Sequence, residues 1–351
     1  MIKFDKVQQL LERENLDALL VMSSYNRRYL SNFTGTSGAL VITPERRYLI
    51  SDFRYKAQGA EQAKDFEFVL QQGGLLDFIA SFMESKNIKR IGFEGEHVNY
   101  NTYSKIKDDF EVVPLTGEVE KIRLIKTKEE VDLIQKACEI ADQAYEYILT
   151  YVKEGMTEME VKNELEAHMT KLGASGPSFD TIVASGHRGA LPHGVASDKV
   201  IESGDMVTLD FGAYYKGYAS DITRTFGVGS VSPEMEDIYN VVLEAQLKSL
   251  EEIKAGMTGS EADAVARDVI KSYGYGENFG HSLGHGFGLE VHELPGLAQQ
   301  STMTLEPGMC VTVEPGIYVD GLGGVRIEDD TIVTETGLKK LTHSSKKLFI
   351  V

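Results

Sequence analysis

The sequence contains little cysteine. Only Cys138 and Cys310 occur among 351 residues, each in an apolar segment, and no CxxC spacing exists. A framework of disulfides needs more cysteines, so the composition excludes small disulfide-stapled proteins and fits a reducing compartment.

Long apolar runs are also absent. No segment approaches the ~20 apolar residues that a bilayer-spanning helix needs. Residues 1–17 have the pattern of an amphipathic helix, which differs from the charged start and apolar core of a secretory signal. We therefore expect a cytoplasmic protein that does not enter a membrane.

Basic residues are in the minority, with 36 Lys and Arg against 54 Asp and Glu and a net charge of −18. An acidic surface repels phosphate backbones and anionic lipids, so neither nucleic acid nor membrane is an expected partner. The excess of acid favours solubility.

At about 150 residues per domain, the length predicts two domains, and a hydrophobic fraction of 42% allows each a core.

Several common catalytic motifs are missing, namely HExxH, the P-loop and GxGxxG. Residues 280–284 match G-x-S-x-G, the nucleophile elbow of serine hydrolases. The elbow needs a strand before it and a helix after it. Residues 272–278 do not resemble a strand, and Gly284, Gly286, Gly288 and Pro295 oppose a helix. The sequence therefore disfavours a serine hydrolase.

Short apolar segments alternate with helical patterns in the first third of the chain. Helical spacing occurs near 55–63 and 75–84. The segments expected to be strands are 16–22, 39–43, 47–52, 90–93 and 111–115. This pattern predicts an α/β domain with a mixed sheet over residues 1–122, without a catalytic cluster of its own.

An internal repeat organises residues 123–351. Val152-Lys-Glu-Gly-Met-Thr157 returns as Ile253-Lys-Ala-Gly-Met-Thr258, and the segment 204–214 matches 308–318. Each copy begins its helices with capping boxes or a Ser-Pro cap. Two copies of a helix–helix–hairpin unit predict a domain with pseudo-twofold symmetry, because a solenoid needs at least ~3 repeats.

Each copy carries acids at matching places. Asp210 matches Glu314 on the first strand of the hairpin, and Asp221 and Glu328 follow on the second. With a two-residue turn at Lys216-Gly217, Asp210 faces Thr223 and shares a face with Asp221. A pseudo-twofold axis would bring the four carboxylates together.

Such acids are costly to bury together unless cations neutralise them. Isolated acids are usually solvated, but the repeated register favours metal binding. Paired divalent ions roughly 3.5–4 Å apart are typical of aminopeptidases, and oxygen-rich sites with one imidazole suit Mn, Co, Fe or Zn.

Histidines cluster between residues 187 and 292. His285, in a Gly-rich segment, is the expected nitrogen ligand, and His193 and His292 are candidates for moving protons or holding an intermediate. A hydrogen-bonded structural role is expected for His187 and His281. No functional context surrounds the three others, His97, His168 and His343.

Three stretches resemble the motifs of the pita-bread metallopeptidases, which include methionine aminopeptidase, aminopeptidase P and prolidase. They are Asp210-Phe-Gly with Asp221-Ile-Thr223, Gly284-His285 with His292-Glu293, and Glu314-Pro-Gly-Ile-Tyr318 with Val325-Arg326-Ile-Glu328. The last stretch resembles the proline-specific branch. Asn32-Phe-Thr-Gly35 and Asp52-Phe-Arg-Tyr55 resemble the leading domain of aminopeptidase P.

This resemblance implies an α+β protein in which an N-terminal α/β creatinase-like domain (1–122) precedes a pseudo-twofold pita-bread catalytic domain (123–351). It implies two divalent ions, Mn first with Co, Zn or Fe possible, and a homodimer. The implied metal ligands are Asp210, Asp221, His285, Glu314 and Glu328. Glu314 would also be the general base. His193 and His292 would contact the scissile peptide, Arg326 would help anchor the substrate, and Thr223 would support Asp210.

The expected activity is removal of the first residue from peptides with proline in second position, as an Xaa-Pro aminopeptidase. One alternative is a prolidase, restricted to Xaa-Pro dipeptides. Another is a catalytically silent binding protein on the same fold. All five ligand positions are filled, which favours an enzyme over the silent protein.

Overall fold

The structure is a computed structural model that describes residues 2–351, so Met1 of the predicted N-terminal helix lies outside it. The chain forms two compact units, and the boundary lies between Arg123 and Leu124. No helix among the described residues is long and apolar enough to cross a bilayer. Cys138 and Cys310 are both free thiols and both buried.

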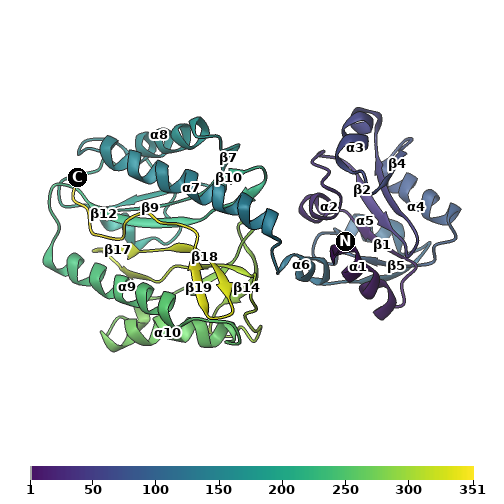
Figure 1. The fold of residues 1–351 in the computed structure, drawn as a ribbon. Coiled ribbons are helices and arrows are strands. Elements are labelled where there is room, and N and C mark those ends of the chain that lie inside the picture. Colours follow the sequence, from purple (N-terminus) through teal and green to yellow (C-terminus); the bar gives the residue numbers. More distant parts are fainter. Residues whose placement is uncertain (1) are drawn as a thin grey trace. The chain divides into compact units, whose positions relative to one another are not determined.

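The first unit is a six-stranded mixed sheet with the strand order β4-β3-β2-β1-β5-β6 (Figure 1). Its strands are β1 (Ala18–Val21), β2 (Ala39–Ile42), β3 (Arg47–Ser51), β4 (Glu67–Leu70), β5 (Arg90–Phe93) and β6 (Glu111–Pro114). Its helices are α1 (Ile2–Arg13), α2 (Ser24–Ser31), α3 (Lys56–Gln62), α4 (Leu75–Ser85), α5 (Tyr100–Ile106) and α6 (Glu118–Arg123), with a 3₁₀ turn η1 (Phe53–Tyr55). The strands and the mixed sheet that the sequence predicts are confirmed.

Both faces of this sheet are covered, which explains why β1 and β2 are wholly apolar. Leu19 and Val21 pack with α1 and α6 on one face, and Ala18 and Leu20 pack with α4 and α5 on the other. Side chains alternate between the faces of a strand, so a sheet buried on both sides needs apolar residues at every position.

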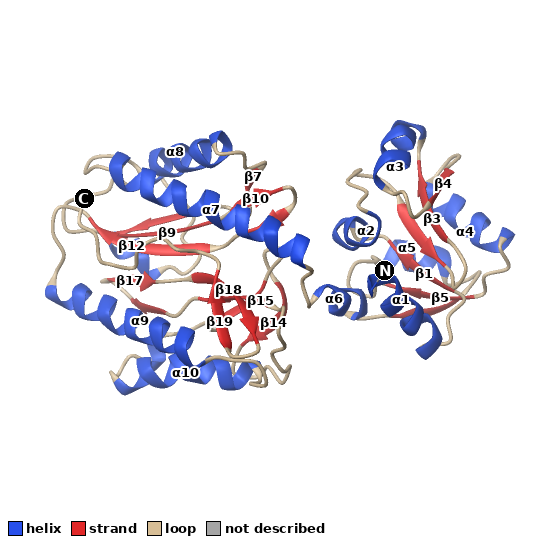
Figure 2. Cartoon of the chain, in the orientation of Figure 1, coloured by secondary structure: helices blue, strands red, loops and turns tan. Residues whose placement is uncertain are grey.

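The second unit places its strands between two pairs of helices (Figure 2). Its helices are α7 (Lys128–Tyr151), α8 (Glu158–Lys171), α9 (Pro233–Glu252) and α10 (Gly259–Ser272), with 3₁₀ turns η2 (Gly186–Ala190) and η3 (Gly276–Asn278). The strands of the first copy are β7 (Gly176–Pro177), β8 (Ile182–Ser185), β9 (Met206–Phe211), β10 (Ala213–Tyr215), β11 (Tyr218–Ala219) and β12 (Ile222–Gly227). Those of the second are β13 (Gly284–Gly286), β14 (Glu293–Leu297), β15 (Cys310–Val313), β16 (Gly316–Val319), β17 (Gly323–Arg326), β18 (Asp329–Thr334) and β19 (Gly337–Lys340).

The predicted repeat is confirmed, because each copy has its own core. One core packs α7 and α8 against β9 and β12, and the other packs α9 and α10 against β15 and β17. The capping boxes that begin at Thr127, Thr157 and Thr258 are all formed, and Ser232 caps α9 with Pro233 in its first turn.

The predicted hairpin register is also confirmed. Lys216 and Gly217 both have positive φ, at 45° and 79°, as a two-residue type I′ turn requires. Tyr215 pairs with Tyr218 beside the turn, and Asp210 pairs with Thr223 further along. The turn therefore fixes which carboxylates share a face.

The strand expected to run through Glu328 is interrupted. β17 ends at Arg326 and pairs with β16, whereas β18 starts at Asp329 in a different sheet. The first copy has the same break at Ser220 and Asp221, between β11 and β12. One acid of each copy thus lies where the chain passes from one sheet to the next.

Candidate metal centre

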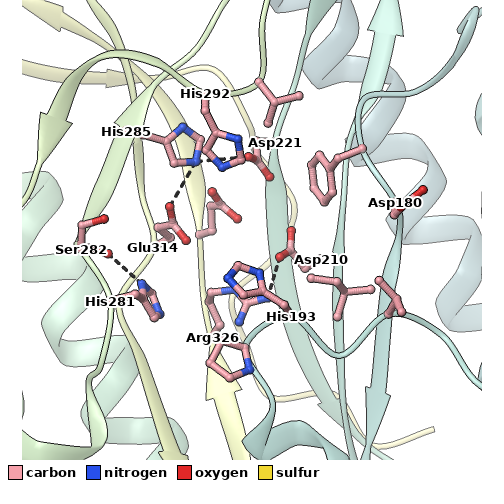
Figure 3. A pocket seen from close by; sticks show the side chains of 16 residues that line it. Asp180, His193, Asp210, Asp221, His281, Ser282, His285, His292, Glu314 and Arg326 are labelled. Carbon is pink, nitrogen blue, oxygen red and sulfur yellow. Dashed lines mark hydrogen bonds and ion pairs between the residues drawn. The ribbon is translucent and has the colours of Figure 1, made fainter.

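A cavity of about 520 Å³ lies between the two copies (Figure 3). Its size is typical of small-ligand sites. Strand β9 and the break before β12 contribute acids from the first copy, and β13, β15 and β17 lead to the residues of the second. The structure brings all the predicted site residues to its wall except Thr223: Asp210, Asp221, His285, Glu314, Glu328, His193, His292 and Arg326.

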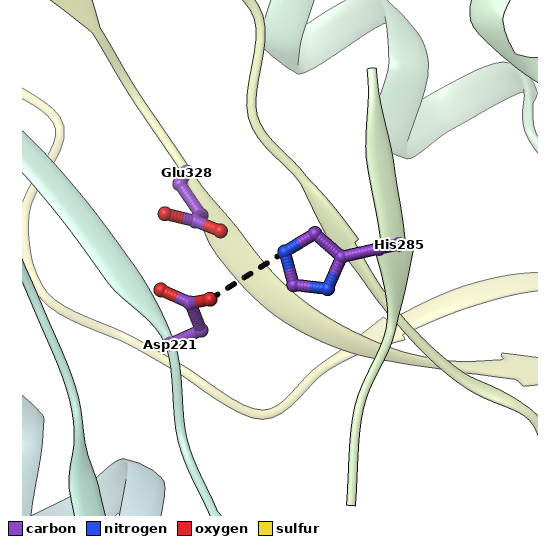
Figure 4. A group of neighbouring side chains, drawn as sticks. All are labelled: Asp221, His285 and Glu328. Carbon is purple, nitrogen blue, oxygen red and sulfur yellow. Dashed lines mark ion pairs between the residues drawn. The ribbon is translucent and has the colours of Figure 1, made fainter. Parts of the chain in front are cut away.

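Three of these side chains form a group that could hold a metal ion (Figure 4). One ligand atom from each of Asp221, His285 and Glu328 lies within 4.8 Å of the others. His285 Nε2 is 3.6 Å from Asp221 Oδ2 and 3.3 Å from Glu314 Oε1. The imidazole therefore stands between the acids of both copies.

Close packing of the backbone sets the direction of His285. A Cβ at Gly284 would lie 2.1 Å from the Thr312 carbonyl oxygen, so only glycine allows β13 to approach β15 this closely. His285 Nδ1 lies 3.0 Å from the Gly286 carbonyl oxygen, which can only accept, so Nδ1 carries the proton. Burial lowers the pKa of His285 to about 4. A neutral ring then directs the lone pair of Nε2 at the carboxylates, as in a metal ligand.

The carboxylates have the electrostatics of a cation site. Burial, followed by the charge of neighbouring acids, raises the pKa of Asp221 and of Glu328 well above the usual range. Burial raises the pKa of Glu314 to about 8. Oδ1 of Asp210 and Oε1 of Glu328 are buried and have no hydrogen-bond partner among residues 2–351. A buried carboxylate oxygen that receives no hydrogen bond needs another partner, and a divalent cation is a suitable one.

A hydroxyl and a guanidinium hold two of the acids in place. Thr223 Oγ1 donates to Glu328 Oε2 at 2.7 Å and accepts from Arg326 Nε at 3.1 Å. Arg326 Nη2 donates to Asp210 Oδ2 at 2.5 Å and Nη1 donates to the Tyr318 hydroxyl at 2.7 Å. The side chain of Thr223 thus contacts Glu328 directly. Thr223 is also the cross-strand partner of Asp210, and the link between their side chains runs through Arg326. The predicted contact of Arg326 with substrate stays a prediction.

We expect Thr223→Val to lower the affinity for Mn²⁺ by roughly 10–100-fold, because groups that orient metal ligands typically contribute that much. Valine keeps the shape of threonine but removes the donor to Glu328. Isothermal titration of the metal-free protein measures the effect. Thr208→Val is the matched control, since Thr208 is also buried in the same sheet but its hydroxyl contacts Thr225 at 3.1 Å. Equal affinities for the two variants would contradict this role of Thr223.

The histidines occupy different parts of the cavity. The rings of His285 and His292 lie 4.3 Å apart between centroids, and His193 is exposed at the cavity wall. His281 also lines the cavity, although the sequence suggested a structural role. Its Nδ1 donates to the Ser282 carbonyl, so Nε2 accepts from the Tyr318 hydroxyl at 2.8 Å.

Tyr318 was not among the predicted site residues. It joins His281 to Arg326 and so to Asp210. Its place in the segment 308–318, which matches 204–214, was the available signal, because that match also located Glu314. The serine-hydrolase alternative is contradicted, since Ser282 precedes strand β13 and no helix follows it.

Comparison with known proteins agrees with this architecture. Residues 132–335 match the model of metallopeptidase family M24, and residues 3–125 match that of the creatinase/prolidase N-terminal domain. The chain is similar to an Xaa-Pro dipeptidase from Bacillus anthracis, with 53% identity, 99% of each chain covered and a TM-score of 0.97. An X-Pro aminopeptidase structure from Thermotoga maritima has 41% identity, coverage of 97% of this chain and 99% of the other, and a TM-score of 0.90.

A curated relative, the Xaa-Pro dipeptidase of Pyrococcus furiosus, is 42% identical over 99% of both chains. The predicted α+β class, with a creatinase-like domain before a pita-bread domain, is confirmed. From its carboxylate and imidazole cavity and from these matches, the chain belongs to metallopeptidase family M24 and carries the creatinase/prolidase N-terminal domain.

Proposed function

We propose that the protein is a two-metal Xaa-Pro dipeptidase, which hydrolyses the bond between a first residue and a C-terminal proline. The observation that carries this proposal is the convergence on a single cavity of one neutral imidazole and four carboxylates, two of them buried and two half-buried. The sequence motifs favoured an Xaa-Pro aminopeptidase. The names of the relatives favour the dipeptidase alternative instead, and the Thermotoga maritima structure keeps the aminopeptidase as second candidate.

Asp210, Asp221, His285, Glu314 and Glu328 would hold the two ions, with Mn first and Co, Zn or Fe as alternatives. When bound, paired divalent ions supply Lewis acidity, which activates water and polarises the peptide carbonyl. Two observations support the fit. One oxygen of Asp210 and one of Glu328 have no hydrogen-bond partner in the described part of the chain, and His285 Nε2 is unprotonated and so has a lone pair to offer.

The remaining steps belong to the side chains of this chain. Glu314 faces the cavity and would take a proton from the attacking water, then pass it to the proline nitrogen as that bond breaks. His193 and His292 line the same cavity and would hold the peptide and the charge that develops on its carbonyl. An Xaa–Pro amide has no N–H, so recognition depends on shape and on this carbonyl.

Peptide length separates the two candidate activities. Xaa-Pro, Xaa-Pro-Yaa and Xaa-Ala peptides with the same first residue are assayed with the manganese-loaded protein. The proposal expects the highest kcat/KM for Xaa-Pro. A higher value for Xaa-Pro-Yaa would show an aminopeptidase. Metal-loaded protein that cleaves none of them would favour the silent binding protein.

Stability should respond to Mn²⁺ more strongly at high pH. The pKa of Glu314 is about 8 in the folded cation-free chain, against an ordinary value of 4.5. Between these values the unfolded chain loses a proton that the folded chain keeps, so cation-free stability falls as pH rises. Bound cations favour the ionised carboxylate and oppose this loss. His285 does not contribute, because its pKa of about 4 leaves it neutral at pH 6 and pH 8.

We therefore expect saturating Mn²⁺ to raise Tm more at pH 8 than at pH 6. Differential scanning fluorimetry at both values measures this, with Mg²⁺ as the comparison ion. Equal increases in Tm at the two pH values would contradict the assignment of Glu314 as a cation ligand.

The proposal also includes a homodimer and a cytoplasmic location, the latter supported by the two unpaired buried cysteines.

A further inference from the structure

His193 is carried by a loop that has little regular structure. The His193 loop, defined as residues 186–196, runs from the end of β8 and contains the 3₁₀ turn η2 and a single β-bridge between Val195 and Ile182. Its residues Pro192 and Val195 line the cavity. So does His193, which Figure 3 labels. A loop of this kind loses conformational entropy when it is ordered, so something must hold it for His193 to keep a fixed position.

One carboxylate joins the two ends of this loop. Glu158, the first residue of α8, is completely buried. Its Oε1 accepts from the Ser185 amide at 2.8 Å and from the Ser185 hydroxyl at 2.9 Å. Its Oε2 accepts from the Ser197 amide at 3.1 Å and from the Ser197 hydroxyl at 2.7 Å. The residues just before and just after the loop therefore share one side chain.

Arg188 extends this connection into the loop. Its Nη1 donates to Glu158 Oε2, and its Nη2 donates to the carbonyl of Val195 at 2.9 Å. Charge-assisted bonds of this kind are stronger than neutral ones, and the N-terminus of α8 favours the negative charge of Glu158. Glu158 thus holds the two ends of the His193 loop, and Arg188 holds the residue two positions beyond His193.

The second copy holds its own histidine segment with different residues. Asp263 on α10 is 1% exposed and pairs with Arg267 at 2.6 Å. Arg267 donates to the carbonyls of Phe279 and His281 at 2.9 and 2.8 Å, and Asp263 accepts from the Leu283 amide at 3.0 Å.

These acids are not repeat equivalents. Thr157 matches Thr258, so the position of Glu158 corresponds to Gly259 and not to Asp263. The two copies therefore use separate sequence solutions, on the same helix of the repeat, to tie down a segment that reaches the cavity. The two ion pairs therefore do not descend from one pair that was present before the repeat was duplicated.

We propose that Glu158 and Arg188 are positioning residues that hold His193 over the metal centre for hydrolysis. The catalytic part of this inference rests on the proposed function. The side chain of Arg188 is 18% exposed. Arg188→Met keeps its aliphatic stem and removes the guanidinium. Lys162→Met is the matched control, because Lys162 lies on α8 and pairs with Glu166 on the same helix at 3.1 Å.

The kinetic test is a double-mutant cycle with His193→Ala. We expect Arg188→Met to lower kcat/KM roughly 10–100-fold, because a displacement of about 1 Å can cost that much, with bound manganese and Lys162→Met activity unchanged. Arg188→Met should lower activity no further in a His193→Ala background. Multiplicative effects of the two substitutions, or a His193→Ala variant with wild-type activity, would overturn the proposal. Arg188→Lys, a milder variant, should give an intermediate loss.

Hydrogen exchange supplies a readout that needs no substrate. Arg188→Met should raise amide exchange in peptides that cover residues 186–196. Helix α8 should stay as protected as it is in Lys162→Met. Unchanged exchange in this loop would overturn the proposal even if activity falls. Wild-type protein that cleaves no Xaa-Pro peptide would refute the proposed function alone, since the exchange result still decides whether the ion pair holds the loop.

Discussion

Replacing Asp221 by asparagine is expected to lower kcat/KM for an Xaa-Pro dipeptide by roughly 10²–10³-fold. Lewis-acid activation is worth several kcal/mol, and each 1.36 kcal/mol is a factor of ten in rate. Asparagine keeps the shape of the side chain but lacks the charge that binds a divalent ion. The measurement is steady-state kinetics with metal content determined on the same samples.

The fold should survive this substitution. The Asp221 amide donates to Asp330 Oδ2 at 2.8 Å, a backbone contact that asparagine keeps. Burial and the neighbouring acids raise the pKa of Asp221, so the folded cation-free chain already disfavours its charge. The Tm of the cation-free variant should therefore equal or exceed that of the wild type.

Asp268→Asn is the matched control for charge, because Asp268 is exposed on α10. It should keep wild-type activity and wild-type metal content. An Asp221→Asn variant that matches this control in both would remove Asp221 from the metal centre.

Glu314→Gln should lower kcat by about 10²–10⁴-fold at saturating Mn²⁺, the usual contribution of a general acid or base. Glutamine can still offer an oxygen to a cation, but it cannot accept a proton from water. Because Thr312 donates to Glu314 Oε1 at 3.2 Å, the side chain should keep its orientation. KM should change much less than kcat, since this role concerns the transition state.

Glu335→Gln, in an exposed turn, is the matched control and should have the wild-type kcat. Metal content must be measured beside the rates, because Glu314 is also a proposed ligand. A Glu314→Gln variant that retains both its metal and a kcat within about tenfold of the wild type would contradict its role as base.

The repeat made the approach of the carboxylates in the candidate metal centre predictable from the sequence. Once 204–214 is aligned with 308–318, Asp210 and Glu314 occupy one register. The Lys216-Gly217 turn then places Thr223 opposite Asp210, as the structure has it. Local rules were sufficient here because a two-residue turn fixes strand pairing, and pairing fixes which side chains share a face.

Contacts between elements distant in the sequence were not predictable in this way. The strand breaks at Asp221 and Glu328 depend on how one sheet passes into the next, which the alternation of apolar residues does not record. The partly buried network from His281 to Tyr318 and Arg326 joins the segment before β13 to the β16–β17 hairpin, and no spacing rule connects His281 with that hairpin. Propensity and periodicity describe one segment at a time, whereas these features arise from tertiary packing.

The most direct measurement is anomalous diffraction from crystals of the protein grown with manganese. The account predicts two Mn²⁺ ions in the cavity, roughly 3.5–4 Å apart, with oxygens of both copies and His285 Nε2 around them. A single peak outside the cavity, or fully active protein whose cavity contains no anomalous scatterer, would contradict it.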